Sequence, residues 1–249
     1  MHGRIAAPLL TLLCLMGAPG RADGSDLFYM MIFGSESDPK QLRLTHTFAT
    51  FVRATGEGTD PAAYALTAHT ISWLPRALDV RVRRLHPEPG VNLDLDSTIR
   101  VVTHDGESVT MWGPYQITPQ IYNRSIEVVN KLNSGRELYR AFDGPINDEI
   151  SNCIHAVADV DPLYGRRRYP LNRVGKPASA FIAKQFIKRS RYDQTALDHG
   201  WLVPRLGLTQ YPIEYVGNQG SPRVAHYEFE SLLSRLRTLD PGWARVPKP

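Results

Sequence analysis

The chain has 249 residues, of which 29 are basic and 25 acidic, and its formal net charge is +4. This near balance gives no general case for nucleic-acid binding. Hydrophobic residues make up 42% of the chain and charged residues 22%, which is ordinary for a globular protein and disfavours disorder.

The N-terminus has the layout of a secretory signal peptide. A short basic start precedes the apolar run Ile5 to Met16, and small and helix-breaking residues follow at 17–20. The apolar run is shorter than the about 20 residues that span a bilayer. We therefore expect cleavage after Ala22 and export to the periplasm or the extracellular space; the alternative is a buried N-terminal helix. No later stretch is apolar for long enough to cross a membrane, and the remaining length suits one domain.

Strand-like segments come first. Residues 27–33 form an apolar segment that could be a strand. Residues 45–52 are rich in β-branched and aromatic side chains and predict a strand, and 64–73 predict another. A turn at 56–61 joins these two in a hairpin with a long loop. His46 and His69 would then lie on neighbouring strands.

The next region is predicted to continue the sheet. After a connection at 76–95, residues 97–103 predict a strand. Asp105-Gly106 is typical of a hairpin turn, and residues 109–112 would form the returning strand.

The clearest helix begins after Thr118. This residue can cap it, Pro119 suits its first turn, and Gly135 suits its C-terminal end. Apolar residues recur at helical spacing between them, at Ile121, Ile126, Val129 and Leu132. Residues 138–142 then predict a short strand.

The remaining chain is predicted to be mainly helical. A turn at 143–145 precedes a helix that carries Cys153 and ends near 161–162. Residues 177–189 predict an amphipathic helix, 201–216 an apolar segment containing strands, and 226–239 a last helix. The basic run at 166–168 is typical of a solvated loop.

Cys153 is the one cysteine left after Cys14 leaves with the signal peptide. An unpaired cysteine in an exported chain suggests an intermolecular bridge or a reactive thiol. The alternative is a buried cysteine that packs as a small hydrophobe. A helix capped by Ser151 or Asn152 would place Cys153 in its first turn, where the amides favour a thiolate. A helix starting near Asn147 would place it mid-helix, and the sequence leaves both open.

A cysteine nucleophile needs a base within hydrogen-bond reach and a group that orients the base. His155 is two residues from Cys153 and points elsewhere on a helix. His46 and His69 are better placed, since strands hold side chains rigidly. The other histidines lack ligand-like spacing, so we expect no metal site and no cofactor.

These residues resemble a known family. A strand histidine in Leu44-Thr45-His46-Thr47-Phe48, a second in Ala68-His69-Thr70-Ile71, a helix, a short aromatic strand and Asn152-Cys153-x-His155 follow one another. This order is similar to the circularly permuted NlpC/P60 branch of the papain-like hydrolases, which includes lecithin-retinol acyltransferase-like proteins. The resemblance covers about residues 44–160. It implies that Cys153 is the nucleophile, His46 the base and His69 the polar orienter, with Asn152 as an oxyanion or substrate-binding residue.

The sequence therefore predicts an α+β fold, with an antiparallel sheet packed against helices. Residues 23–165 would form a papain-like core, and 166–249 a C-terminal extension packed on the same domain. The predicted function is a thiol hydrolase or acyltransferase that cleaves an amide or ester of a small cell-envelope peptide or lipid. The alternatives are a non-catalytic envelope or binding protein with the same fold and an inert Cys153, and a dimer linked through Cys153.

Overall fold

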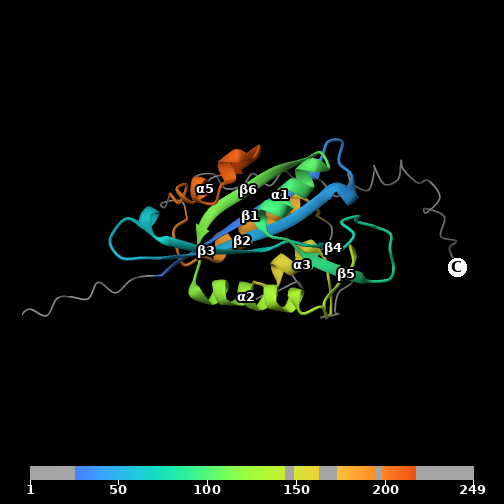
Figure 1. The fold of residues 1–249 in the computed structure, drawn as a ribbon, viewed down its shortest axis with the longest axis horizontal. Coiled ribbons are helices and arrows are strands. Elements are labelled where there is room, and N and C mark those ends of the chain that lie inside the picture. Colours follow the sequence, from blue (N-terminus) through green and yellow to red (C-terminus); the bar gives the residue numbers. More distant parts are fainter. Residues whose placement is uncertain (1–25, 144–148, 163–172, 195–197, 217–249) are drawn as a thin grey trace, which may run out of the picture.

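The computed structural model describes residues 26–143, 149–162, 173–194 and 198–216 (Figure 1). The predicted signal peptide at 1–22, the basic run at 166–168 and the last predicted helix at 226–239 lie outside these ranges. The described part of the chain contains two sheets packed against helices, which places the protein in the α+β class.

The main sheet has five strands in the order β3-β2-β1-β6-β9. The pairs β3–β2, β2–β1 and β1–β6 are antiparallel, whereas β9 runs parallel to β6, so the sheet is mixed and not purely antiparallel as predicted. The strands are β1 (Leu27–Ser37), β2 (Thr45–Thr55), β3 (Ala65–Ile71), β6 (Glu107–Gln116) and β9 (Ile213–Val216).

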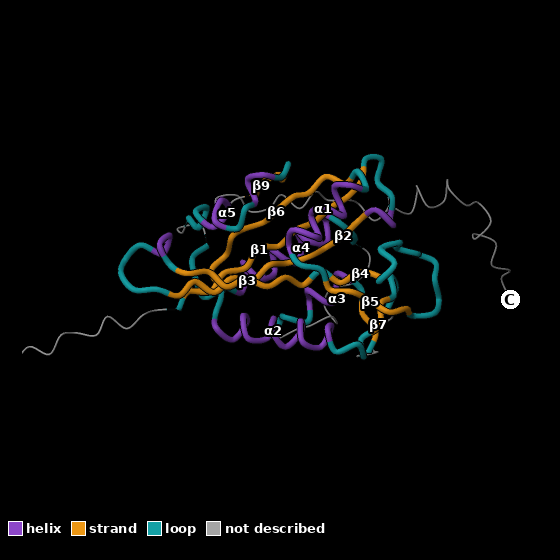
Figure 2. The backbone as a smooth tube through the Cα atoms, viewed as in Figure 1, coloured by secondary structure: helices purple, strands orange, loops and turns teal. Residues whose placement is uncertain are grey.

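A smaller sheet lies at one end of the molecule, in the order β4-β5-β7-β8 (Figure 2). Its strands are β4 (Trp73–Pro75), β5 (Glu88–Asn92), β7 (Leu138–Tyr139) and β8 (Ile150–Ser151). The Asn92 side chain fixes the bend between the two sheets, because it accepts from the Ser72 amide at 2.8 Å and donates to the Thr70 carbonyl at 2.8 Å.

Helices cover both faces of the main sheet, with α2 on one side and α5 on the other (Figure 1). We call the face covered by α2, α3 and α4 the α4 face, and the face covered by α1 and α5 the α1 face. The helices are α1 (Leu95–His104), α2 (Pro119–Asn133), α3 (Cys153–Ala158), α4 (Lys176–Arg189) and α5 (Leu202–Arg205). The described ranges also contain the single 3-10 turns η1 (Leu42–Leu44) between β1 and β2, η2 (Pro61–Ala63) between β2 and β3, and η4 (Leu208–Gln210) between α5 and β9.

The alternation of side chains along β2 supplies both cores. Successive residues of a strand point to opposite faces, and the eight side chains from 45 to 52 are all buried. Ala49 and Phe51 belong to the core of the α4 face, whereas Phe48 and Val52 belong to the core of the α1 face. A strand covered on both faces is therefore continuously apolar or uncharged.

Helix α4 packs unusually closely on β1 because of Gly34. A Cβ atom at Gly34 would lie 2.7 Å from the Ser179 hydroxyl and 2.8 Å from the Lys176 Cα. The Ser179 hydroxyl donates to the Phe33 carbonyl at 2.7 Å. The part of the chain predicted to be a C-terminal extension thus supplies both a helix over the sheet and, through β9, a strand within it.

The predicted helices at 119–133 and 177–189 and the hairpin of β2 and β3 are confirmed. Thr118 caps α2 as expected, by accepting from the Ile121 amide at 3.4 Å. The apolar segment at 27–33 is a strand, β1.

The predicted strand at 97–103 is wrong, because these residues form α1. Their β-branched side chains suggested a strand, but Asp94 caps a helix by accepting from the Ser97 amide at 2.8 Å. Ile99 and Val102 face the core at helical spacing while Asp96 and Arg100 face solvent. The predicted hairpin turn instead ends the helix at Gly106, whose φ is +78°.

Two further segments differ in detail. The connection at 76–95 contains β5, whose short and glycine-containing sequence gives little strand signal. The segment at 201–216 contains α5, η4 and the single strand β9.

The cap of α1 gives a testable consequence. Asp94→Ala removes the bonds to the Ser97 amide and hydroxyl, and we expect it to lower the free energy of unfolding by about 1 kcal/mol. Asp94→Asn keeps an acceptor and should lower it much less. Urea unfolding of both variants measures this difference, and equal losses would contradict the cap.

Candidate functional site

Cys153 is the first residue of α3, and Asn152 is its cap. The Asn152 Oδ1 accepts from the His155 amide at 2.9 Å, and its Nδ2 donates to the Ala141 carbonyl at 3.3 Å. Of the two helix starts that the sequence left open, the first is therefore confirmed. Both polar atoms of the Asn152 side chain therefore bond to backbone groups, and the role that the structure shows for this residue is that of a helix cap.

The Cys153 thiol is a free thiol on a half-buried residue. Burial raises its pKa to about 11. Nearby backbone amides, that of Thr47 first among them, act in the opposite direction, and the charge of Asp143 raises the pKa further. The thiol is therefore protonated at neutral pH, the opposite of what a nucleophilic cysteine requires.

His46 lies on the α1 face, away from Cys153. It shares that face with Phe48, on whose ring it stacks at 5.4 Å, and its Nε2 is 2.9 Å from the Ser72 hydroxyl. Cys153 packs against the core of the opposite face. The two side chains thus lie against different cores. No hydrogen bond joins His46 to Cys153 among the described residues, and the role of His46 as the base of Cys153 stays a prediction.

His69 lies on the α4 face, but α2 holds it at a distance from Cys153. It stacks on Phe51 at 5.6 Å and its Nε2 is 2.7 Å from the Ser125 hydroxyl. Its strand partner Phe51 is four residues from Thr47, which corresponds to about 13 Å along β2.

The predicted pairing of His46 with His69 is wrong. The cross-strand partner of His69 is Phe51, and positions 46 and 51 are an odd number of residues apart, so the two imidazoles face opposite sides of the sheet. Burial lowers the pKa of His46 to about 3 and that of His69 to about 4. Both rings are therefore neutral at physiological pH.

The sequence interpretation set aside His155, whose side chain has a buried carboxylate partner. His155 Nδ1 lies 2.6 Å from Asp143 Oδ2, and both side chains are buried. The sequence signal that could have identified His155 is its position in Asn152-Cys153-x-His155. Because Asn152 caps α3, the side chain three residues later points into the core. Asp143 lies in a sequence typical of a turn, and nothing in that sequence predicts that its side chain is buried.

A second buried polar group lies on the α1 face. The Ser35 hydroxyl, directly opposite His46 in the β1–β2 pairing, donates to Glu107 Oε2 at 2.5 Å. Burial raises the pKa of Glu107 to about 7. The His46 Nδ1 is buried and has no hydrogen-bond partner among the described residues.

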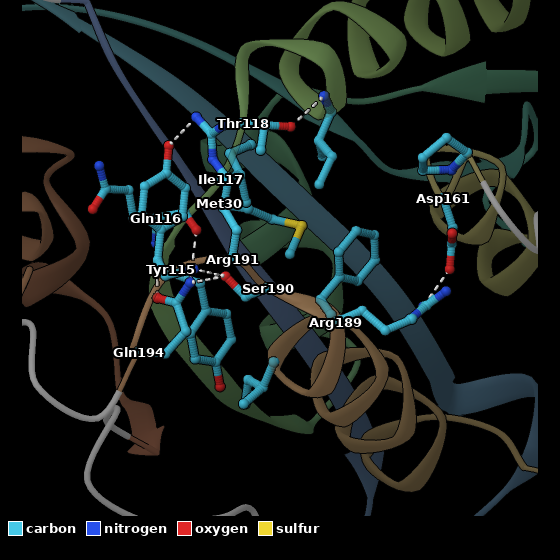
Figure 3. Close-up of a pocket in the computed structure, with 15 residues that line it drawn as sticks. Met30, Tyr115, Gln116, Ile117, Thr118, Asp161, Arg189, Ser190, Arg191 and Gln194 are labelled. Carbon is cyan, nitrogen blue, oxygen red and sulfur yellow. Dashed lines mark hydrogen bonds and ion pairs between the residues drawn. The ribbon is translucent and has the colours of Figure 1, made fainter.

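A cavity of about 130 Å³ opens on the α4 face, where β6 passes into α2 and α4 ends. Figure 3 shows Asp161 and Arg189 on one side of it and Gln116 and Gln194 on the other. Its apolar wall comprises Met30, Ile117, Ile121, Phe186 and Ile187.

The polar groups of this cavity differ in how they are satisfied. Asp161 forms an ion pair with Arg189, and the Gln194 side chain bonds both the amide and the carbonyl of Gln116, at 3.0 and 2.7 Å. The Tyr115 hydroxyl is buried and, within the described ranges, has no hydrogen-bond partner. Burial also raises its pKa, so it remains a neutral donor.

The described residues contain no cluster of three or more histidine, cysteine, aspartate or glutamate side chains that could hold a metal ion. None of the helices in the described ranges is both long and apolar enough to cross a membrane. No protein-family model, curated protein or solved structure matches the chain.

The environment of Cys153 predicts slow alkylation. With a pKa of about 11 against an ordinary 9.0, its thiolate fraction at neutral pH is about a hundredfold below that of a free cysteine. We expect iodoacetamide to label it correspondingly slowly, as followed by peptide-resolved mass spectrometry, which distinguishes it from Cys14. His46→Ala should leave the rate unchanged, and unfolding in urea should raise it. Fast labelling that His46→Ala abolishes would contradict this geometry.

Glu107 predicts a pH-dependent stability. Its folded-state pKa of about 7 lies above the ordinary 4.5, so the unfolded chain releases this proton first and stability falls as the pH rises between these values. Glu107→Gln should remove this fall and stabilise the protein above pH 7 by up to about 3 kcal/mol. Urea unfolding at pH 4.5 and above pH 7 measures it, with Glu57→Gln, in an exposed loop, as the control.

The histidines act in the opposite direction, since a lowered pKa costs stability as the pH falls below 6.5. The difference between wild type and Glu107→Gln cancels this contribution. An unchanged pH slope in Glu107→Gln would show that Glu107 ionises as an ordinary exposed carboxyl.

Proposed function

We propose that this protein is a non-catalytic binding protein that holds a small, mainly apolar molecule with one acidic or hydrogen-bond-accepting group in the cavity between β6, α2 and α4. The observation that carries this proposal is Tyr115, a residue of the cavity wall whose hydroxyl is buried without a partner in the described residues. Such a group costs about 1–3 kcal/mol. A ligand that accepts its hydrogen bond removes that cost.

The size and lining of the cavity support a small ligand. Its volume of about 130 Å³ is below the roughly 300–1,000 Å³ of pockets for drug-sized molecules. The wall formed by Met30, Ile121 and Phe186 suits an aliphatic or aromatic body. Arg191, whose guanidinium contacts only the Tyr192 hydroxyl and ring within the described residues, favours an acidic group on the ligand.

The state of Cys153 supports a non-catalytic role. A protonated thiol with a pKa of about 11, in contact with the Thr47 backbone amide, suits a cysteine that fills space between α3 and β2. The buried hydrogen bond between His155 and Asp143 then has a structural role, because it anchors the chain before α3 to the core.

A thiol hydrolase or acyltransferase on a papain-like core is the second candidate. One observation favours it, namely that Asn152-Cys153-x-His155 opens a helix packed on the strand that carries His46, beside a buried histidine–carboxylate pair. This function requires an imidazole within hydrogen-bond reach of the Cys153 sulfur, a contact that is absent among the described residues. Amides or esters of envelope peptides or lipids would be its substrates. The alkylation experiment with His46→Ala separates the two candidates.

Tyr115→Phe tests the binding function. In the free protein the variant loses an unpartnered buried hydroxyl, so we expect a higher melting temperature. For short-chain carboxylates from acetate to hexanoate, which serve as probes, we expect an affinity about tenfold lower than that of the wild type. Isothermal titration calorimetry measures the affinities, and alkylamines of equal chain length are the matched ligands of opposite charge.

Tyr29→Phe is the matched control, because Tyr29 is a buried tyrosine of the same sheet whose side chain lies on the α1 face. It should not change carboxylate affinity. Equal binding of carboxylates by the wild type and Tyr115→Phe, or no binding by either, would contradict the proposal.

A further inference from the structure

The loop that joins β4 to β5, residues 76–87, protrudes at the end of the molecule that carries the small sheet (Figure 1). Backbone hydrogen bonds fix it, from the Leu78 amide to the Pro75 carbonyl at 2.8 Å and from the Arg84 amide to the Arg81 carbonyl at 3.0 Å. Arg140 also donates to the Leu85 carbonyl at 3.1 Å. The loop therefore presents a defined surface.

Apolar side chains project from this surface into solvent. Leu85 is 80% exposed, Leu78 39% and Phe142, two residues beyond Arg140, 49%. These are three of the five large hydrophobic side chains that are exposed in the described part of the chain. Leu78 also has a φ of +56°, a backbone conformation that residues other than glycine rarely adopt. Leu78 and Leu85 belong to the loop, and Phe142 follows Arg140, which contacts the loop. Exposed apolar groups on one surface mark interaction sites more often than scattered ones do.

The same loop carries several arginines. A concavity of about 600 Å³ is lined by Arg43 from η1 and by residues 79–84 of the loop. Arg81 pairs with Asp79 at 3.0 Å and Arg84 with Glu88 at 2.9 Å. The other arginines of this surface, Arg43, Arg76 and Arg83, have no ion-pair partner in the described ranges, so the surface has a net positive charge.

We propose that this surface, formed by the 76–87 loop with Arg43 and Phe142, docks the protein on an anionic phospholipid membrane. Arginines near a negatively charged leaflet are each attracted to it, and projecting leucine and phenylalanine side chains gain free energy by entering the interface. A nucleic acid would engage the arginines but would give Leu85 no apolar environment to enter. The pairing of exposed leucine with arginine therefore favours lipid over a polyanion in water.

Vesicle flotation of the full chain tests this docking. We expect stronger binding to vesicles of equal parts phosphatidylcholine and phosphatidylglycerol than to phosphatidylcholine alone, and weaker binding at high salt. Arg81→Gln with Arg83→Gln should lower binding to the anionic vesicles by roughly twentyfold, and Leu85→Ser by about tenfold. Ile126→Ser on α2 and Arg100→Gln on α1 are the matched controls and should bind like the wild type.

A second measurement distinguishes membrane contact by the loop from membrane contact by the apolar N-terminal residues, which the wild type and all the variants have in common. In Leu85→Trp, brominated acyl chains should quench the new indole, whereas in Ile126→Trp they should not. Unquenched Leu85→Trp, or binding that Leu85→Ser and the arginine substitutions leave unchanged, would overturn the proposal. Binding to duplex DNA without binding to anionic vesicles would overturn it in favour of a nucleic acid.

Discussion

The period-two alternation of β2, together with its burial on both faces, determines which side chains of this protein can meet. β2 lies between β1 and β3 and contributes to both cores, so no residue of its buried half can rotate to the other face. Thr47 faces α4, where its hydroxyl is 3.0 Å from that of Ser179, and its backbone amide approaches Cys153. His46 must then face α1. A shift of one residue in this strand would exchange the faces to which His46 and Thr47 point. It would also move Phe48 and Phe51 each into the opposite core, so the observed register is strongly specified.

The cap at Asn152 fixes the other half of the arrangement. Its side chain joins the first turn of α3 to the segment after β7, because it accepts from the His155 amide and donates to the Ala141 carbonyl. With the start of α3 fixed in this way, Cys153 faces β2, and His155 turns inward to Asp143. The histidine of this short motif is therefore paired with a carboxylate whose charge also acts on the cysteine. The same four residues that suggest a catalytic site in the sequence also form a structural junction between α3 and the segment after β7.

Much of the fold was predictable because local signals agreed with the tertiary structure. Helix α2 has a threonine cap, a proline in its first turn and a regular apolar face, and no later contact overrides these preferences. In α1 the β-branched residues favoured a strand, but the cap at Asp94 and the burial of Ile99 and Val102 on one face outweighed them. The cavity was not predictable, since its walls come from β1, β6, α2 and α4, which are far apart in the sequence. The side of the sheet that each histidine faces was not predictable either, because it depends on a register that only the β1–β2 and β2–β3 pairings define.

Several buried polar atoms lack hydrogen-bond partners in the described chain, and two of them, on His46 and Tyr115, lie in different surroundings. The His46 Nδ1 lies in the core of the α1 face, where the ring stacks on Phe48 and its other nitrogen bonds Ser72. Burial keeps this imidazole neutral, and its Nδ1 lacks the hydrogen bond that it would form in water. This loss lowers the stability of the fold. The Tyr115 hydroxyl also lacks a partner, but Tyr115 lines a cavity that has an apolar wall and a nearby arginine. A deficit in a closed core is a stability cost, whereas the same deficit beside a cavity is one that binding can remove. Under the proposed binding function, Tyr115 is therefore the residue whose missing hydrogen bond a ligand can supply.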